Sequence, residues 1–147
     1  MERRGTCAAR NFLNDFHEQF EITAHPQNAG QARERVRALA ERAGLSGLDL
    51  ADVEIAVGEA VTNAILYGSP TAASLIVIIS GLGDGSFFVE IRDQGHGFDP
   101  GVLHDEEDNF EALDGRGIRL MHALMDHVEI HHNGLGMIAR LCKRLAA

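Results

Sequence analysis

The sequence predicts an α+β fold: a two-layer sandwich in which a mixed, mostly antiparallel sheet carries three main helices on one face. Three observations lead to this prediction. The chain has 147 residues, which suits one domain built around one core. Its apolar patterns follow the order β-α-α-β-β-loop-α-β-β, so the helices are few. Short turns join most of the strands, which is typical of antiparallel sheets with helices gathered on one side.

The first half of the chain supplies one strand and two helices. Residues 1–15 have weak patterning and are expected to form an N-terminal tail, ahead of a single domain over 16–147. Apolar and polar residues alternate over 16–24, which predicts a strand. Residues 28–43 and 48–67 carry apolar side chains at helical spacing, so we expect a helix in each.

The second half supplies two hairpins and a third helix. Residues 73–80 are apolar and rich in β-branched side chains, and 86–93 returns after the turn GLGDG, which predicts a hairpin. A loop of roughly twenty residues, a length that is usually functional or disordered, precedes a helix expected over 118–127. The last hairpin should join HVEIHHN to GMIARLCKRL across Asn133-Gly134.

Composition excludes several classes of function. The net charge of −9 argues against direct binding to nucleic acid, because phosphate contacts need clustered Lys and Arg. The sequence has no run of 18 apolar residues, so no membrane span is expected. The N-terminus lacks an apolar segment of signal-peptide type, and we therefore expect a cytoplasmic protein.

A first polar cluster lies inside the second expected helix. Glu59 and Asn63 are four residues apart, so their side chains meet on one helix face, beside the apolar stripe. A partly buried carboxylate must be paired or must serve a function. The alternative is a boundary pair that merely bonds neighbouring backbone groups.

A second cluster, IRDQGHGFDP, follows the returning strand of the first hairpin. The strand ends in Asp93, and Gly95 and Gly97 come directly after it. A carboxylate at a strand end can accept a hydrogen bond from an exocyclic amine. Glycines without a Cβ let the backbone approach a flat ring closely. The alternative is an ordinary turn with two glycines.

A third cluster, DGRGIRLM, opens the third expected helix. Gly115 and Gly117 precede the helix and expose backbone N–H groups at the positive end of its dipole, which suits a phosphate. Arg116 and Arg119 add positive charge nearby. The alternative is a glycine-rich helix start after a loop.

The order and spacing of these clusters are more specific than any one of them. Together they resemble the ATP-binding (GHKL) domain of gyrase and histidine kinases. EAVTNAI, RDQGHGFDP, GRGIRLM and LMDHVEI resemble, more narrowly, the bacterial anti-sigma-factor serine/threonine kinases, over roughly residues 16–145. The resemblance implies Mg²⁺ and ATP as cofactors.

The resemblance also implies a role for each cluster. Asn63 would ligate Mg²⁺ between the phosphates, and Glu59 would act as general base on the attacking hydroxyl. Asp93 would bind the adenine amine. Gly95 and Gly97 would line the base pocket. The phosphate site would be formed by Gly115, Arg116 and Gly117, and the lid over ATP by residues 101–114.

The family implies a kinase that phosphorylates an anti-anti-sigma antagonist protein and sequesters a sigma factor or similar regulator by partner switching. Related kinases often form homodimers. The alternative is a catalytically weak or inactive binding module that only holds a protein partner. Two departures favour that alternative. Leu113 stands where family members carry a phosphate-contacting arginine, and Met137 and Ile138 stand where a threonine often supports adenine.

Overall fold

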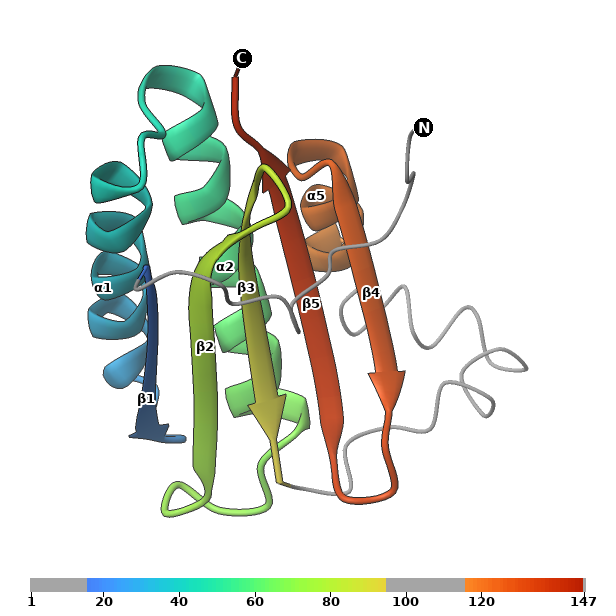
Figure 1. Cartoon of the computed structure of the whole chain (residues 1–147). Helices are drawn as coiled ribbons and strands as arrows, with labels where there is room; N and C mark the ends of the chain where they lie inside the picture. Colours follow the sequence, from blue (N-terminus) through green and yellow to red (C-terminus); the bar gives the residue numbers. More distant parts are fainter. Residues whose placement is uncertain (1–15, 95–115, 147) are drawn as a thin grey trace.

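The computed structural model describes residues 16–94 and 116–146. These residues form a five-stranded sheet of order β1-β2-β3-β5-β4 and three helices. Figure 1 shows the helices together on one face of the sheet. The elements are β1 (His17–Thr23), α1 (Asn28–Arg42), α2 (Gly47–Tyr67), β2 (Leu75–Gly83), β3 (Ser86–Asp93), α5 (Arg116–Leu124), β4 (His127–His132) and β5 (Met137–Arg144).

The α+β class and the two-layer arrangement are confirmed. Neighbouring strands pair antiparallel in all four pairs of the described sheet, so the part of the chain that is described contains no parallel pair and is simpler than the mixed sheet expected. The expected tail over 1–15 lies outside the described residues. Among the described helices, none combines the length and the apolar character needed to cross a bilayer.

The turn of the first hairpin is tighter than expected. Pairing between β2 and β3 continues to Gly83 and Ser86, so Asp84 and Gly85 alone form the turn. Both have positive φ, at 52° and 77°. Asp-Gly is a preferred pair for two-residue turns of this kind, because their twist matches that of the flanking strands.

Helix α5 ends earlier than the predicted boundary at residue 127. It stops at Leu124, and β4 begins at His127. Asp126 accounts for the difference, because its N–H donates to the Cys142 carbonyl at 2.9 Å and its carboxylate accepts the Arg144 N–H at 2.6 Å. These bonds attach the chain to β5, so it cannot continue as a helix.

The last hairpin has a longer turn than Asn133-Gly134 alone. Pairing between β4 and β5 ends at His132 and Met137, which leaves four residues in the turn. The Asn133 side-chain oxygen accepts the backbone N–H groups of Leu135 and Gly136, each at 2.9 Å. The asparagine side chain therefore satisfies backbone donors that a two-residue turn would not have exposed.

The core lies between the sheet and α2. The expected apolar stripe of α2, formed by Leu50, Val53, Val57 and Val61, is buried throughout. It faces side chains from alternate positions of the inner strands, since successive strand residues point to opposite faces. The fully buried members from the sheet include Ile76, Ile78, Phe87, Val89 and Leu141. This packing fixes α2, which carries Glu59 and Asn63.

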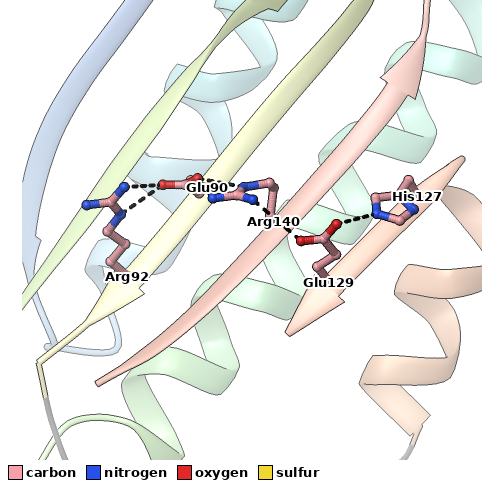
Figure 2. Close-up of polar contacts among 5 residues, drawn as sticks. All are labelled: Glu90, Arg92, His127, Glu129 and Arg140. Atoms are coloured by element: carbon pink, nitrogen blue, oxygen red, sulfur yellow. Dashed lines mark hydrogen bonds and ion pairs between the residues drawn. The ribbon is translucent and has the colours of Figure 1, made fainter. Parts of the chain in front are cut away.

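The opposite face of the sheet carries a charged ladder across β3, β5 and β4 (Figure 2). Arg140 of β5 lies in register with Glu90 of β3 and with Glu129 of β4. It donates to Glu90 at 2.6 Å and contacts Glu129 at 3.4 Å, while Arg92 and His127 bond the two carboxylates from the outside. Cross-strand pairs of opposite charge stabilise a sheet in this way. The sequence pattern did not reveal this ladder.

Lys143 ties the end of α5 to the start of α2. Its side chain is only 10% exposed and faces the helical layer. Its ammonium donates to the Leu124 carbonyl at 2.6 Å and to Asp52 at 3.0 Å, and it lies 3.9 Å from Asp49. The contact therefore joins the two helices that border the candidate site described below.

We predict that Lys143→Met lowers the free energy of unfolding by about 1–3 kcal/mol, because it removes a buried donor from a part-buried carbonyl and carboxylate. Urea unfolding measures this loss. Arg37→Met is the matched control, since Arg37 makes exposed ion pairs to Glu41 and Glu54 and should cost less than about 1 kcal/mol. Equal losses in both variants would show that Lys143 is not a buried tie.

Candidate nucleotide and catalytic site

Helix α2 presents Glu59 and Asn63 at the edge of the core, as the sequence predicts. Both side chains are half-buried, one helical turn apart. Among the described residues, neither side chain makes a hydrogen bond or an ion pair. The alternative in which they satisfy neighbouring backbone groups therefore finds no support in the described part of the chain. A half-buried carboxylate must be paired or must serve a function, and Glu59 has no partner within residues 16–94 and 116–146, which favours a role in binding or catalysis.

Asn63 borders a hollow between the end of α2, the end of β3 and α5. Asp93 is the carboxylate of this hollow, and Asn63 supplies its amide. The other walls are largely apolar and come from β3, α5, β4 and β5, through Ile91, Ile118, Met121, Ile130, Met137 and Ala139. A mostly apolar cleft with a few convergent polar groups is typical of small-molecule sites.

Asp93 is held at the point where three segments meet. The Met137 N–H donates to its Oδ1 at 3.0 Å. A Cβ on Gly68, at the end of α2, would lie 1.8 Å from Asp93 Oδ2. A Cβ on Gly136, just before β5, would lie 2.0 Å from the Asp93 carbonyl oxygen. Only glycine fits at these two positions, so the two glycines let both segments close around Asp93.

The residues present fit a purine nucleotide with Mg²⁺. Apolar side chains suit a flat base, and the oriented carboxylate of Asp93 suits its exocyclic amine. The Asn63 side chain offers the hard oxygen ligand that Mg²⁺ takes, and this ion keeps several waters and needs few protein ligands. Within the described ranges, no three or more His, Cys, Asp or Glu side chains are arranged so that they could hold a metal ion, so a dedicated all-protein metal cage is not seen there.

The predicted site residues divide between two places. Asn63 and Asp93 line the same hollow, whereas Glu59 lines a neighbouring one between α1 and α2. At the start of α5, Gly117 is buried beside the lining residue Ile118, and Arg116 is exposed. The other assigned positions lie outside the described residues, namely Gly95, Gly97, the lid over 101–114 with Leu113, and Gly115.

Sequence reasoning missed two members of the site. Neither Gly68 nor Gly136 was assigned to the site from the sequence. Met137 was noted for its side chain, which does line the hollow, but its backbone N–H also orients Asp93. Ile138 is absent from the lining, because successive residues of β5 face opposite sides of the sheet. The glycines could have been suspected only by knowing that their segments converge on Asp93.

Comparisons with known proteins agree with the fold. The sequence matches the histidine kinase-like ATPase domain over residues 22–143. It is 31% identical over 137 residues to the serine-protein kinase RsbW of Oceanobacillus iheyensis, covering 87% of this chain and 86% of that protein. It is 28% identical over 131 residues to an anti-sigma F factor of Thermoanaerobacter, covering 82% and 88% respectively.

A solved structure shares the fold. It contains the RsbU and RsbW domains of a Mycobacterium tuberculosis protein and superimposes with a TM-score of 0.66 at 24% identity. The match covers 88% of this chain and 33% of the longer one. At this identity the likeness supports the fold alone.

We predict that Gly136→Ala destabilises the chain by about 1–3 kcal/mol and weakens nucleotide binding, because the new methyl group would displace Asp93. Thermal unfolding and a calorimetric ADP titration measure the two effects. Gly30→Ala in α1 is the matched control, since its Cβ meets no atom within 4 Å. It should be neutral or stabilising by up to about 1 kcal/mol. Unchanged ADP affinity in Gly136→Ala would contradict the role given to this close approach.

Proposed function

Because the chain belongs to the histidine kinase-like ATPase domain family, we propose that it is a Mg²⁺-ATP-dependent protein serine/threonine kinase. Its substrate is an antagonist protein of the anti-anti-sigma type. The chain also sequesters a sigma factor or an equivalent regulator. The phosphorylation state of the antagonist decides which of the two partners it holds. This proposal is supported by similarity to a serine-protein kinase and to anti-sigma F factors. It places the protein in the cytoplasm.

One observation carries the proposal: Glu59 is a half-buried carboxylate with no partner among the described residues, one helical turn from Asn63. Phosphoryl transfer needs positioning and charge neutralisation more than covalent help. A general base must lie within hydrogen-bond reach of the hydroxyl that attacks, so it belongs beside the ligand of the metal. Mg²⁺, when bound, neutralises charge on the phosphates.

Each predicted site residue has a proposed task. Glu59 takes the proton from the acceptor hydroxyl, and the Asn63 oxygen holds Mg²⁺. Asp93 accepts a hydrogen bond from the adenine amine, in an orientation set by the Met137 N–H. The start of α5, with Gly117 and Arg116, faces the phosphates. Outside the described residues, the base pocket is assigned to Gly95 and Gly97, a further phosphate contact to Gly115, and the lid to 101–114.

The first prediction from this proposal concerns nucleotide binding. With Mg²⁺ and ADP at about a hundred times Kd, stability should rise by roughly 2.7 kcal/mol. For a chain of this length each kcal/mol shifts Tm by about 2–4 °C, which a thermal melt resolves. Asp93→Asn should reduce the shift, because the adenine amine loses its carboxylate acceptor.

Asp84→Asn is the control for that change. It makes the same chemical substitution in the β2–β3 turn, where Asn tolerates positive φ. Its nucleotide-induced shift should equal that of the wild type. A wild-type melt unmoved by millimolar nucleotide would favour the alternative, in which the fold only holds a protein partner.

The second prediction separates the base from the metal ligand. Glu59→Gln should keep ATP binding and lose phosphoryl transfer by about 10²- to 10⁴-fold, the usual contribution of general-base catalysis. Asn63→Ala should instead weaken Mg²⁺-dependent ATP binding, with transfer lost as a consequence. Transfer of labelled phosphate to the antagonist and an ATP titration report the two effects.

Both variants should stay folded, since neither side chain belongs to the buried stripe of α2. Circular dichroism melts provide the check. Wild-type rates of transfer by Glu59→Gln would rule out the base assignment. Unfolding of either variant would indicate that Glu59 and Asn63 have a purely structural role.

A further inference from the structure

Glu59 lines a second hollow, separate from the candidate nucleotide site that Asn63 and Asp93 line. This hollow lies between α1 and α2, has a volume of about 550 Å³ including its part open to solvent, and is bordered by Glu54, Ile55, Gly58, Glu59 and Thr62 of α2. Asn63 borders the first hollow and not this one. The carboxylate of Glu59 therefore stands between the candidate nucleotide site and a separate opening to solvent.

Exposed apolar side chains continue this opening along α2. Ile55 is 45% exposed and Leu66 is 58% exposed, with the exposed Thr62 between them. Thr62 lies seven positions after Ile55 and four before Leu66, so the three residues form one stripe on the helix. We call this stripe the outer ridge. Glu59 adjoins the outer ridge on the side nearer the core.

We propose that the outer ridge and the second hollow bind the segment of the protein substrate that carries the acceptor hydroxyl. This inference rests on the proposed kinase function. The hydroxyl must come within hydrogen-bond reach of Glu59, while the nucleotide occupies the side of Asn63 and Asp93. Among the described residues, the second hollow is an opening that reaches Glu59, one helical turn from Asn63. Ile55 and Leu66 then contact apolar side chains that flank the acceptor.

The spacing of the ridge sets the length of the segment. Ile55 and Leu66 are eleven positions apart, which is about 16 Å along a helix. An extended chain advances about 3.3 Å per residue, so roughly five substrate residues span the ridge. Glu59 is four positions from Ile55, or about 6 Å. The acceptor residue therefore lies roughly two residues from the substrate side chain that contacts Ile55 and three from the substrate side chain that contacts Leu66.

The charges of the hollow favour an uncharged segment. Glu54 pairs with Arg33 at 3.8 Å and with Arg37 at 3.2 Å, and Arg37 also pairs with Glu41 at 3.6 Å, so two cations are balanced by two carboxylates within the protein. The carboxylate without a described partner is Glu59, which is assigned to the hydroxyl proton. A serine or threonine between apolar residues matches this surface better than an acceptor between charged residues.

The test replaces the apolar flanks one at a time, as Ile55→Asp and Leu66→Asp. The probe is the antagonist protein that accepts labelled phosphate from the wild-type chain. Each variant should raise KM for the antagonist by about tenfold or more, because an unpaired charge would face an apolar side chain. The affinity for ADP should stay within about twofold, since neither residue lines the nucleotide hollow. Ile55→Ser gives a milder change at the same position if an aspartate impairs folding.

Leu48→Asp is the matched control, because Leu48 is an 82% exposed leucine in the first turn of the same helix, far from Glu59. It should leave KM unchanged. Antagonist KM values in Ile55→Asp, Ile55→Ser and Leu66→Asp equal to the control would overturn the docking surface while leaving the kinase function intact. A wild type that binds ADP but transfers no phosphate would instead overturn the proposed function, and this inference with it.

Discussion

The close approach of three chain segments at Asp93 is the constraint on which the rest of the site depends. The last residue of β3, the end of α2 and the start of β5 meet there, and the Met137 N–H fixes the carboxylate. Gly68 and Gly136 make the approach feasible, because a methyl group at either position would occupy the space of Asp93. The hollow lined by α2, α5 and β5 lies beside this junction.

Helix α2 connects this junction to the proposed chemistry. The buried apolar stripe of α2 packs against the sheet. The adjacent face of the helix directs Asn63 toward the candidate nucleotide site and Glu59 toward the second hollow. A rigid helix therefore sets the separation between the residues proposed as metal ligand and as base. Lys143 anchors the start of the same helix to the end of α5, so the two helices beside the hollow share one buried tie.

Periodicity and turn chemistry predicted most of the fold, since α2 and the β2–β3 hairpin depend on local patterns of apolar residues. The family resemblance named Glu59, Asn63 and Asp93, and the likeness to anti-sigma-factor kinases is confirmed. The close contacts of Gly68 and Gly136 could not be predicted, because each depends on a residue distant in the chain. The end of α5 was wrong for the same reason, since Asp126 bonds β5.

The most direct test of this account is a crystal structure of the chain with Mg²⁺ and a non-hydrolysable ATP analogue. We predict that the adenine amine contacts the Asp93 carboxylate, and that the Asn63 oxygen ligates Mg²⁺ at about 2.0–2.1 Å. Glu59 should lie off the metal, facing the opening between α1 and α2. A nucleotide bound away from Asp93, or Glu59 ligating the metal in place of Asn63, would contradict the division of tasks along α2.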